Sequence, residues 1–347
     1  MPYDGKPNSS TPELLARLRE LDRTGALSLP PPGAGSTDIR HAALFEFGRA
    51  GLSLARLAEA HTDALAIFVE AGKEAPVGQL YGVWASDGPK SWLTIKQMSG
   101  GKIGVNGTKK YCSGARLLDA ALVSAHEADC ASSAESGTAT AVNATRGEAT
   151  PDSRATADHV VLLNVPLSTP GLTIDASEWV APAFSGTATA SVTFDNVELN
   201  VADIIGPPDW YLTRPGFWHG ALGPAACWAG GAVGLVDAAR ASSNRDPHAR
   251  AQLGALEAAE WGLRALLAQA AREIDADPCD TSGEARRRAL MVRHLIERMC
   301  TDVLDRFGRA TGPQLLAFDG QIAQRHAELS LYIRQCHAER DLSTIPR

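Results

Sequence analysis

The stretch Gly104-Val-Asn-Gly-Thr-Lys-Lys-Tyr-Cys-Ser-Gly-Ala115 combines a turn dipeptide with a short β-type run that ends in a hydroxyl and a glycine. Asn106-Gly107 tolerates the positive φ angles of a two-residue hairpin, so we expect a hairpin turn there. Tyr111 and Ser113 are two residues apart in the strand that follows, so we expect them on one face of a sheet. An aromatic ring beside a hydroxyl group held at a fixed position suits the binding of a flat conjugated cofactor. The alternative is an ordinary strand-turn-strand segment.

Composition places the chain among ordinary globular proteins. Of its 347 residues, 44% are hydrophobic and 21% are charged, which allows a substantial core and two or three domains. The formal net charge of −7 argues against a nucleic-acid partner, because contacts to phosphates need clustered Lys and Arg.

The six cysteines are scattered, without Cys-x-x-Cys spacing or a compact framework. This pattern favours a reducing compartment and gives no sign of a zinc cluster, so we predict no metal site. The N-terminus has no apolar signal core, and no apolar run approaches the ~20 residues of a membrane span. We therefore expect a cytoplasmic protein without a membrane span.

Helical periodicity predicts a helical region at the N-terminus. Thr11-Pro12 is a typical helix start because proline fits the first turn. We expect a second helix from about residue 37 and a third from 53 to about 72. The third helix has an apolar stripe that includes Leu57 and Phe68.

From residue 80 the pattern changes to short β-type runs separated by Gly, Asn and Pro. Four runs have the length and β-branched content of strands: 92–97, 122–125, 159–165 and 192–194. No long helix separates them, which favours a small antiparallel barrel over a parallel α/β sheet. We interpret most of 127–158, rich in Ala, Ser, Thr and Gly, as a surface loop with a weak strand near 138–142.

The last part of the chain is again helical. Residues 220–244 are rich in Ala and Gly, which favours close helix–helix approach. Pro247 starts a further helix, with Leu256 and Trp261 expected toward the core.

Two more helices complete the C-terminal pattern. Thr281-Ser-Gly-Glu284 has a capping-box pattern, and Thr311-Gly312-Pro313 stops the helix that it opens. With a last helix to about residue 341, the pattern predicts an antiparallel four-helix bundle. The fold class is therefore α+β multidomain. We expect a helical domain at 1–78, a β-barrel domain at 79–206 and a helical bundle at 207–347.

Three landmarks in this layout resemble the acyl-CoA dehydrogenase superfamily of flavoproteins. They are Tyr81-Gly-Val-Trp-Ala-Ser-Asp-Gly-Pro89, the stretch 104–115, and Ser191-Val-Thr-Phe-Asp-Asn-Val-Glu-Leu199 leading into Ile204-Ile-Gly-Pro-Pro208. The resemblance covers nearly the full chain and implies FAD as the cofactor. Ala85-Ser-Asp87 departs from the usual Glu-Pro-Gly run of the superfamily.

The resemblance implies which residues contact the flavin. Tyr111 stands where an aromatic residue packs on the isoalloxazine ring, and Ser113 where a hydroxyl bonds its N5 edge. A donor at N5 stabilises the negative charge that arrives with a hydride. Tyr81 and Val83 match the segment that meets the pyrimidine end. Trp84 replaces a hydroxyl residue, and it either stacks on the flavin or belongs to the core.

Two arginines fall near positions that hold the adenosine diphosphate part of FAD in the superfamily. Arg245 follows the first long C-terminal helix, and Arg309 lies where members present a Gly-Gly turn from a neighbouring subunit. The alternative for both is an ordinary surface arginine. Because this end of FAD usually sits at a subunit boundary, the resemblance implies a homodimer or homotetramer.

Dehydrogenation beside a thioester also needs a general base at about hydrogen-bond distance from the substrate. In the superfamily this base is commonly a Glu after an Arg-Asp pair. Arg340-Asp341 matches the pair, and no Glu follows it in the sequence. His337 and Glu339 are candidates beside the pair, with a solvated helix end as the alternative. His219, on a Gly-rich turn, is a third candidate.

The resemblance implies an FAD-dependent oxidoreductase acting on an acyl-CoA or a related apolar acyl substrate. The sequence does not identify its electron acceptor. A flavin-dependent monooxygenase on the same fold is the second hypothesis, favoured by the histidine candidates. The third is a degenerate, non-catalytic member that serves in binding or assembly.

Overall fold

The computed structural model describes residues 11–88, 91–127, 159–242 and 246–345. Its contacts divide into two compact units. The helical unit comprises Met1–Ala66, Ala181–Thr187 and Trp218–Arg347, and the sheet unit comprises Ile67–Val180 and Ala188–Phe217. The predicted loop at 127–158 with its weak strand lies almost entirely outside the described residues, as does Arg245.

The three expected N-terminal helices are confirmed. They are α1 (Thr11–Arg23), α2 (Thr37–Ala50) and α3 (Leu52–Glu70). The stripe predicted on α3 is buried, because Leu57 and Phe68 are almost fully covered. Burial of this apolar face is the main source of stability for such a helix.

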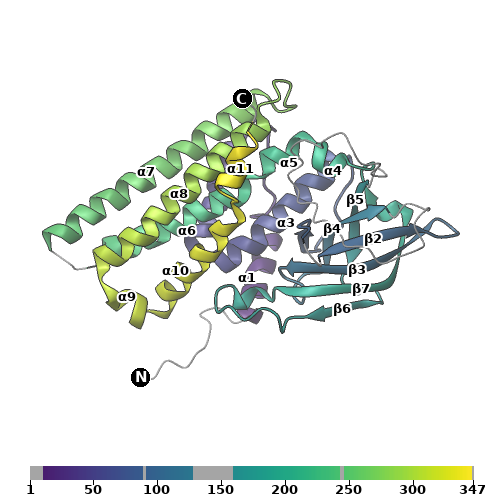
Figure 1. Cartoon of the computed structure of the whole chain (residues 1–347), viewed down its shortest axis with the longest axis horizontal. Helices are drawn as coiled ribbons and strands as arrows, with labels where there is room; N and C mark the ends of the chain where they lie inside the picture. Colours follow the sequence, from purple (N-terminus) through teal and green to yellow (C-terminus); the bar gives the residue numbers. More distant parts are fainter. Residues whose placement is uncertain (1–10, 89–90, 128–158, 243–245, 346–347) are drawn as a thin grey trace. The chain divides into compact units, whose positions relative to one another are not determined.

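Four helices form the expected C-terminal bundle: α6 (Leu222–Ala241), α7 (Pro247–Ala276), α8 (Ala285–Thr311) and α10 (Gly320–Tyr332). Figure 1 shows α7 and α8 running side by side. Shorter elements lie at the end of the chain: α9 (Pro313–Phe318), η3 (Ile333–Gln335) and α11 (Glu339–Ser343).

The small residues of α6 allow the close approach that the sequence predicts. A Cβ atom on Gly230 would lie 1.9 Å from the Phe45 carbonyl oxygen of α2. In the same contact, a Cβ on Gly48 would lie 2.2 Å from the Cys227 carbonyl oxygen. Both distances are far below van der Waals contact, so glycine is required at these crossings.

The expectation that no apolar run has the length of a membrane span needs a correction. The segment Pro215–Ala241 is long and apolar enough to cross a membrane by length and composition. Of its most apolar window, 72% is buried inside the structure. The apolar composition therefore agrees with its place as the packed central helix of the bundle.

Two details of the bundle prediction are wrong. Glu284 is the N-cap of α8, but its side chain makes no capping hydrogen bond. The Ala285 N–H instead donates a hydrogen bond to the Asp280 carboxylate at 2.8 Å. The proposed capping box is therefore absent at this described helix start. Trp261, expected in the core, is 75% exposed, whereas Leu256 is fully buried. The predicted stop at Gly312 is confirmed, with φ of 67°.

The described part of the sheet unit contains eight strands, and the four predicted strands are among them. The strands are β1 (Tyr81–Trp84), β2 (Trp92–Gln97), β3 (Lys102–Cys112), β4 (Ala120–Glu127), β5 (Val160–Pro166), β6 (Leu172–Asp175), β7 (Ala190–Asn200) and β8 (Ile204–Ile205). Their order is β6-β7-β3-β2-β4-β5-β8, with β1 paired to β4. The pairs β1–β4 and β2–β4 are parallel and the others antiparallel.

The predicted order of helices, sheet and helices is confirmed, but the barrel is not closed. No strand pair between β6 and β8 joins the ends of the sheet in the part of the chain that the structure describes. The core of the sheet unit lies on the apolar residues of the central strands, among them Val105, Leu163 and Phe194.

The expected hairpin turn at Asn106-Gly107 is wrong, because both residues lie inside β3. The turn between β2 and β3 instead uses Gly100 and Gly101, with φ of 74° and 70°. Gly107 has φ of 126° at a register shift between β3 and β7, which is a β-bulge. A Cβ there would lie 2.2 Å from the Trp92 carbonyl oxygen. Asn106-Gly107 thus forms part of a β-bulge, which needs the same backbone freedom as a turn.

Candidate functional site

The end of β3 is the first candidate region, and it lies in the sheet unit. Tyr111 has φ of 61°, which is unusual for a residue with a side chain. A second register shift between β3 and β7 falls here, between Lys109 and Cys112. The expected alternation is therefore broken: the Tyr111 side chain is 63% exposed, while Ser113 is 8% exposed. Strained backbone of this kind is common at ligand and active sites, so the end of β3 is a candidate ligand site.

The Ser113 hydroxyl meets a second hydroxyl that sequence reasoning missed. Its Oγ lies 3.1 Å from Thr189 Oγ1, and both residues are buried. Thr189 directly precedes β7, so the pairing of β3 with β7 brings the two hydroxyls together. Each hydroxyl is able to donate and to accept. No sequence pattern announces this contact, because a threonine before a strand is common.

Trp84 connects β1 to the same segment. Its Nε1 donates a hydrogen bond to the Ser113 carbonyl oxygen at 3.1 Å, and the residue is 4% exposed within the sheet core. A Cβ on Gly82 would lie 2.8 Å from this Nε1 atom, so the small residue at 82 makes room for the indole. The structure thus places Trp84 as in the core alternative, where it holds the Ser113 backbone.

The other two residues predicted at the pyrimidine end lie on β1. Tyr81 is fully buried; its hydroxyl donates to Gln79 Oε1 at 3.0 Å, and its ring meets Phe68 edge-on with centroids 5.2 Å apart. Burial raises the pKa of Tyr81 to about 12. Val83 is half-buried. A contact of either residue with a flavin stays a prediction.

Of the arginines predicted to hold the adenosine end, Arg309 lies within the described residues. It is in the last turn of α8 and forms an exposed ion pair with Asp305 at 2.9 Å. Exposed pairs of this spacing are weak, so the guanidinium is able to exchange its partner.

The three predicted base candidates differ sharply in their surroundings. His219 ends α5 (Pro215–Gly220), which is a short helix rather than the expected turn. Its side chain is buried, and Nε2 donates to the Pro278 carbonyl oxygen at 3.2 Å. Glu339 is exposed at the start of α11. His337 lies between these extremes, in the segment that precedes α11.

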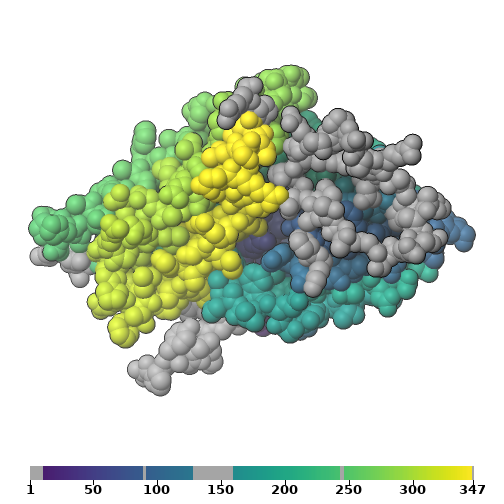
Figure 2. Space-filling model, viewed as in Figure 1, coloured from purple at the N-terminus to yellow at the C-terminus, as the bar shows by residue number. Residues whose placement is uncertain are grey.

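His337 and Asp341 form an oriented pair in the helical unit. Nδ1 of His337 lies 3.2 Å from Oδ1 of Asp341, and the His337 backbone N–H donates to Oδ2 at 3.2 Å. The His337 side chain is 55% exposed, while that of Asp341 is 6% exposed. The C-terminal segment, yellow in Figure 2, lies at the surface of the helical unit. An exposed imidazole held by a buried carboxylate is the arrangement of an oriented general base.

Glu59 of α3 is a further acid–base candidate that sequence reasoning missed. Its carboxylate is buried, and it forms no ion pair or hydrogen bond among the described residues. Burial and the Asp63 charge raise its pKa to about 7, against the opposing charge of Arg56. A Cβ on Gly223 would lie 2.9 Å from Oε1. The available signal is a pair of acidic residues four apart, Glu59 and Asp63, beside the apolar stripe of α3.

The sheet unit buries a different charge cluster just before Tyr111. Lys109 is fully buried, and its ammonium bonds the Asp87 carboxylate and the Ser124 hydroxyl, the latter at 2.8 Å. His126 Nε2 lies 3.2 Å from the other Asp87 oxygen, and its ring stacks on Trp92 with centroids 3.4 Å apart. Burial lowers the pKa of Lys109 despite the Asp87 charge. The ion pair of Lys109 and Asp87 anchors the segment that follows β1 to strand β3.

No group of three or more His, Cys, Asp and Glu in the described ranges is placed to hold a metal ion.

The arrangement of helices, sheet and helices defines an acyl-CoA dehydrogenase-like fold. No family model and no curated protein matches the sequence. Solved structures with this fold include two named as monooxygenases. The dibenzothiophene monooxygenase TdsC of Paenibacillus sp. A11-2, seen with FMN and indole, has 18% identity and a TM-score of 0.72, over 96% of this chain and 94% of that chain.

Two further solved structures show the same fold. Methanesulfinate monooxygenase MsuC from Pseudomonas fluorescens has 18% identity and a TM-score of 0.70, over 96% of this chain and 92% of that chain. A nitrososynthase from Micromonospora carbonacea var. africana has 17% identity and a TM-score of 0.69, with the same shares covered.

Proposed function

We propose that this chain is a flavin-dependent oxidoreductase and, within that class, a monooxygenase of a small organic substrate. The observation that carries the proposal is the end of β3, where Tyr111 is exposed and Ser113, two residues further along, pairs its hydroxyl with that of Thr189. The similar structures named above support the choice of monooxygenase, because two of them are monooxygenases and one was seen with FMN.

The residues at the end of β3 fit a flavin. The ring of Tyr111 offers an apolar face, and the Ser113 hydroxyl offers a donor for a ring nitrogen. The hydroxyl is pre-oriented, because its backbone is held by Trp84 and its oxygen by Thr189. Pre-oriented donors stabilise developing charge without reorganisation during the reaction. A bound flavin would supply the redox chemistry.

We assign the proton transfer to His337, whose imidazole is oriented by the buried Asp341 carboxylate. A positioned imidazole suits proton transfer near neutral pH. The pKa of Glu59 is raised to about 7, and we propose this residue as an additional acid–base group.

The finer assignments stay proposals. FAD is the cofactor that the sequence resemblance implies, with Arg245 and Arg309 at its adenosine end; FMN is the alternative that TdsC suggests. An acyl or CoA-linked substrate follows from the resemblance alone. We also propose a cytoplasmic protein, from the scattered cysteines, and a homo-oligomer.

The test is oxygen consumption by the purified protein with reduced FMN or FAD and indole, the ligand seen with TdsC. A monooxygenase is expected to couple oxygen uptake to an oxygenated product. A dehydrogenase would instead bleach its oxidised flavin under an acyl-CoA without oxygen. A colourless protein that takes up neither flavin would overturn both forms of the proposal.

A further inference from the structure

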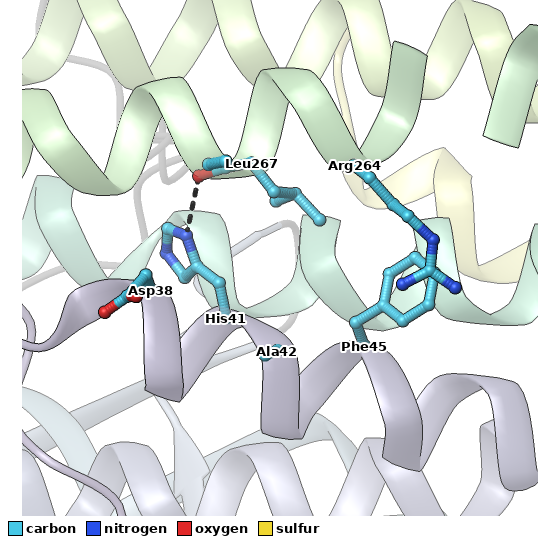
Figure 3. Close-up of a pocket in the computed structure, with 7 residues that line it drawn as sticks. Asp38, His41, Ala42, Phe45, Arg264 and Leu267 are labelled. Atoms are coloured by element: carbon cyan, nitrogen blue, oxygen red, sulfur yellow. Dashed lines mark hydrogen bonds between the residues drawn. The ribbon is translucent and has the colours of Figure 1, made fainter. Parts of the chain in front are cut away.

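A pocket opens between helices α2 and α7 of the helical unit. It has a volume of about 260 Å³, and seven residues line it: Asp38, His41, Ala42, Phe45, Arg264, Leu267 and Ala268. In Figure 3, the His41 side chain points from α2 toward α7, and the Arg264 side chain points from α7 toward Phe45. No lining residue belongs to the end of β3 or to the His337–Asp341 pair. The pocket is therefore separate from the residues to which we assign the flavin chemistry.

The walls of the pocket suit a flat ring. The Arg264 guanidinium stacks over the Phe45 ring, with Cζ 4.2 Å from the ring centroid. A guanidinium has two faces that attract aromatic rings, and Phe45 occupies one of them. Leu267 and the alanines of the lining add aliphatic surface. A planar aromatic ligand therefore gains both apolar contact and the second face of the guanidinium.

His41 adds a buried hydrogen-bond acceptor to the lining. The residue is 3% exposed, and its Nδ1 donates to the Leu267 carbonyl oxygen at 3.3 Å (Figure 3). Burial lowers the pKa of His41 to about 4, so the ring is neutral at pH 7 and Nε2 keeps an unshared electron pair. Nε2 has no hydrogen-bond partner among the described residues. A ligand that brings an N–H or O–H group would supply that partner.

The charges around the pocket favour a neutral ligand over an ion. The Arg264 guanidinium is already paired with Glu260 at 3.0 Å. Asp38 is exposed in the same lining, and its carboxylate would repel an anion. The neutral imidazole of His41 attracts neither sign of charge strongly. The polar contribution of the pocket is therefore a hydrogen bond rather than an ion pair.

The size of the pocket sets an upper limit on its ligand. Sites for drug-sized ligands and cofactors have volumes of roughly 300–1,000 Å³. A pocket of about 260 Å³ is too small for a flavin or a CoA thioester. It has room for a single ring or for two fused rings.

We infer that the α2–α7 pocket is a binding site for a neutral, planar aromatic molecule of one or two rings that carries an N–H or O–H group, such as an indole or a phenol. The ring stacks on the Arg264 guanidinium and contacts Leu267 and Ala268. Its N–H or O–H donates to Nε2 of His41. The site is additional to the proposed flavin site, and its ligand is bound without a chemical step.

The first test is isothermal titration calorimetry of the full chain with indole, in the absence of flavin. The wild type is expected to bind indole. 1-Methylindole has the same rings but no N–H, so it is expected to bind about tenfold or more weakly. No binding of indole by the wild type overturns the proposal, as does equal affinity for the two ligands.

The second test locates the bound indole. Ala268→Leu fills the pocket from α7 with a residue that also favours a helix, and it is expected to weaken indole binding about tenfold or more. Ala258→Leu makes the same change at an exposed position of α7 outside the pocket and is expected to bind as the wild type does. Equal affinities of the two variants overturn the pocket as the site.

The third test concerns the acceptor. His41→Leu removes Nε2, so this variant is expected to bind indole and 1-methylindole equally. A retained preference for indole overturns the role of His41. Because His41 is buried, the fold of the variant is checked by circular dichroism, and the Ala268→Leu result does not depend on it.

The site and the proposed function fail separately. Oxygen uptake with reduced flavin is expected to be unchanged in Ala268→Leu, because residue 268 belongs to neither the end of β3 nor the His337–Asp341 pair. Loss of both indole binding and oxygen uptake in this variant overturns the claim of an additional site. Indole binding without any flavin activity supports the pocket and counts against the proposed function alone.

Discussion

The two units bury charge in opposite ways. In the sheet unit, Lys109 and Asp87 neutralise each other, and Ser124 and His126 complete their hydrogen bonds. In the helical unit, the Glu59 carboxylate is buried without an ion pair or hydrogen bond among the described residues. Both groups are removed from water, which is costly for any charge. The sheet unit keeps its charges by pairing them, whereas Glu59 holds its proton to about pH 7.

This difference separates a structural role from a chemical one. A paired ion has no reason to change its protonation near neutral pH, so the Lys109–Asp87 pair serves to fix β3 and the segment after β1. A buried carboxyl with a pKa of about 7 exchanges its proton in the range in which enzymes work. Four substitutions test this contrast, from the largest expected effect to the smallest.

The first substitution breaks the pair in the sheet unit. Asp87→Asn leaves the Lys109 ammonium buried without a counter-charge, and loss of one partner of a buried pair costs about 3–5 kcal/mol. Urea unfolding followed by circular dichroism measures this loss of stability. The double variant Asp87→Asn/Lys109→Met is the control and is expected to recover much of the stability. A single variant within about 1 kcal/mol of wild type would show that the pair is not needed.

The second substitution removes the titrating group of the helical unit. A carboxyl whose pKa rises from 4.5 to about 7 on folding keeps the folded state more protonated between these values. The contribution of Glu59 to the free energy of unfolding is therefore complete below pH 4.5. It is lost as the pH rises through 7, by at most about 1.4 kcal/mol per pH unit. Glu59→Gln is expected to flatten the stability profile in this window.

Stability between pH 4.5 and 8 is compared for Glu59→Gln, for the exposed Glu46→Gln and for the wild type. Glu46→Gln is expected to keep the slope of the wild type. Equal slopes for all three proteins would mean that Glu59 is ionised throughout and would remove it as an acid–base candidate.

The third substitution changes a buried carboxylate that has a partner. Asp341→Asn keeps the size of the side chain but loses the charge that binds the His337 backbone N–H and imidazole. Removal of a charge-assisted hydrogen bond of this kind costs about 1–3 kcal/mol. The urea midpoint of the helical unit measures it. Glu339→Gln, at an exposed position two residues away, is expected to leave the midpoint unchanged, and an equal loss in both would contradict the assignment.

The fourth substitution gives the baseline for the other three. Glu198→Gln breaks the exposed ion pair with Lys102, in which the atoms are 2.8 Å apart. Solvent screens such pairs, so no measurable change in the urea midpoint is expected. A clear loss would indicate that surface pairs also stabilise this sheet, and the contrast drawn from Asp87 would then be weaker.

Elements with strong periodicity were predictable from the sequence. Helices such as α1 and α7 have a buried stripe and a proline at the start, and strands such as β2 have β-branched runs, so local pattern and tertiary burial agree. The pattern at Asn106-Gly107 predicts a hairpin, because a bulge and a turn use the same backbone freedom. The pattern at Trp261 predicts a core position, because hydropathy alone does not distinguish an apolar residue on an outer stripe from one on an inner stripe.

The candidate site was less predictable. Ser113 and Tyr111 are close in sequence, so their spacing is enough to suggest them as candidates, although the left-handed backbone at Tyr111 gives them different exposures. Thr189 is distant in sequence and reaches Ser113 through the pairing of β3 with β7. Contacts that depend on strand pairing are not encoded in local pattern. The roles of the predicted site residues stay predictions.

Flavin binding at the end of β3 is tested most directly by titrating the apoprotein with FMN and with FAD. Flavin absorbance and Tyr-dependent quenching of flavin fluorescence are recorded for wild type, Ser113→Ala and Tyr111→Ala. Tyr3→Ala, at a position outside the described residues, is the control. We predict that wild type and Tyr3→Ala bind one flavin, that Ser113→Ala binds about tenfold or more weakly, and that Tyr111→Ala loses the quenching. Equal binding and quenching by all four proteins would contradict the account.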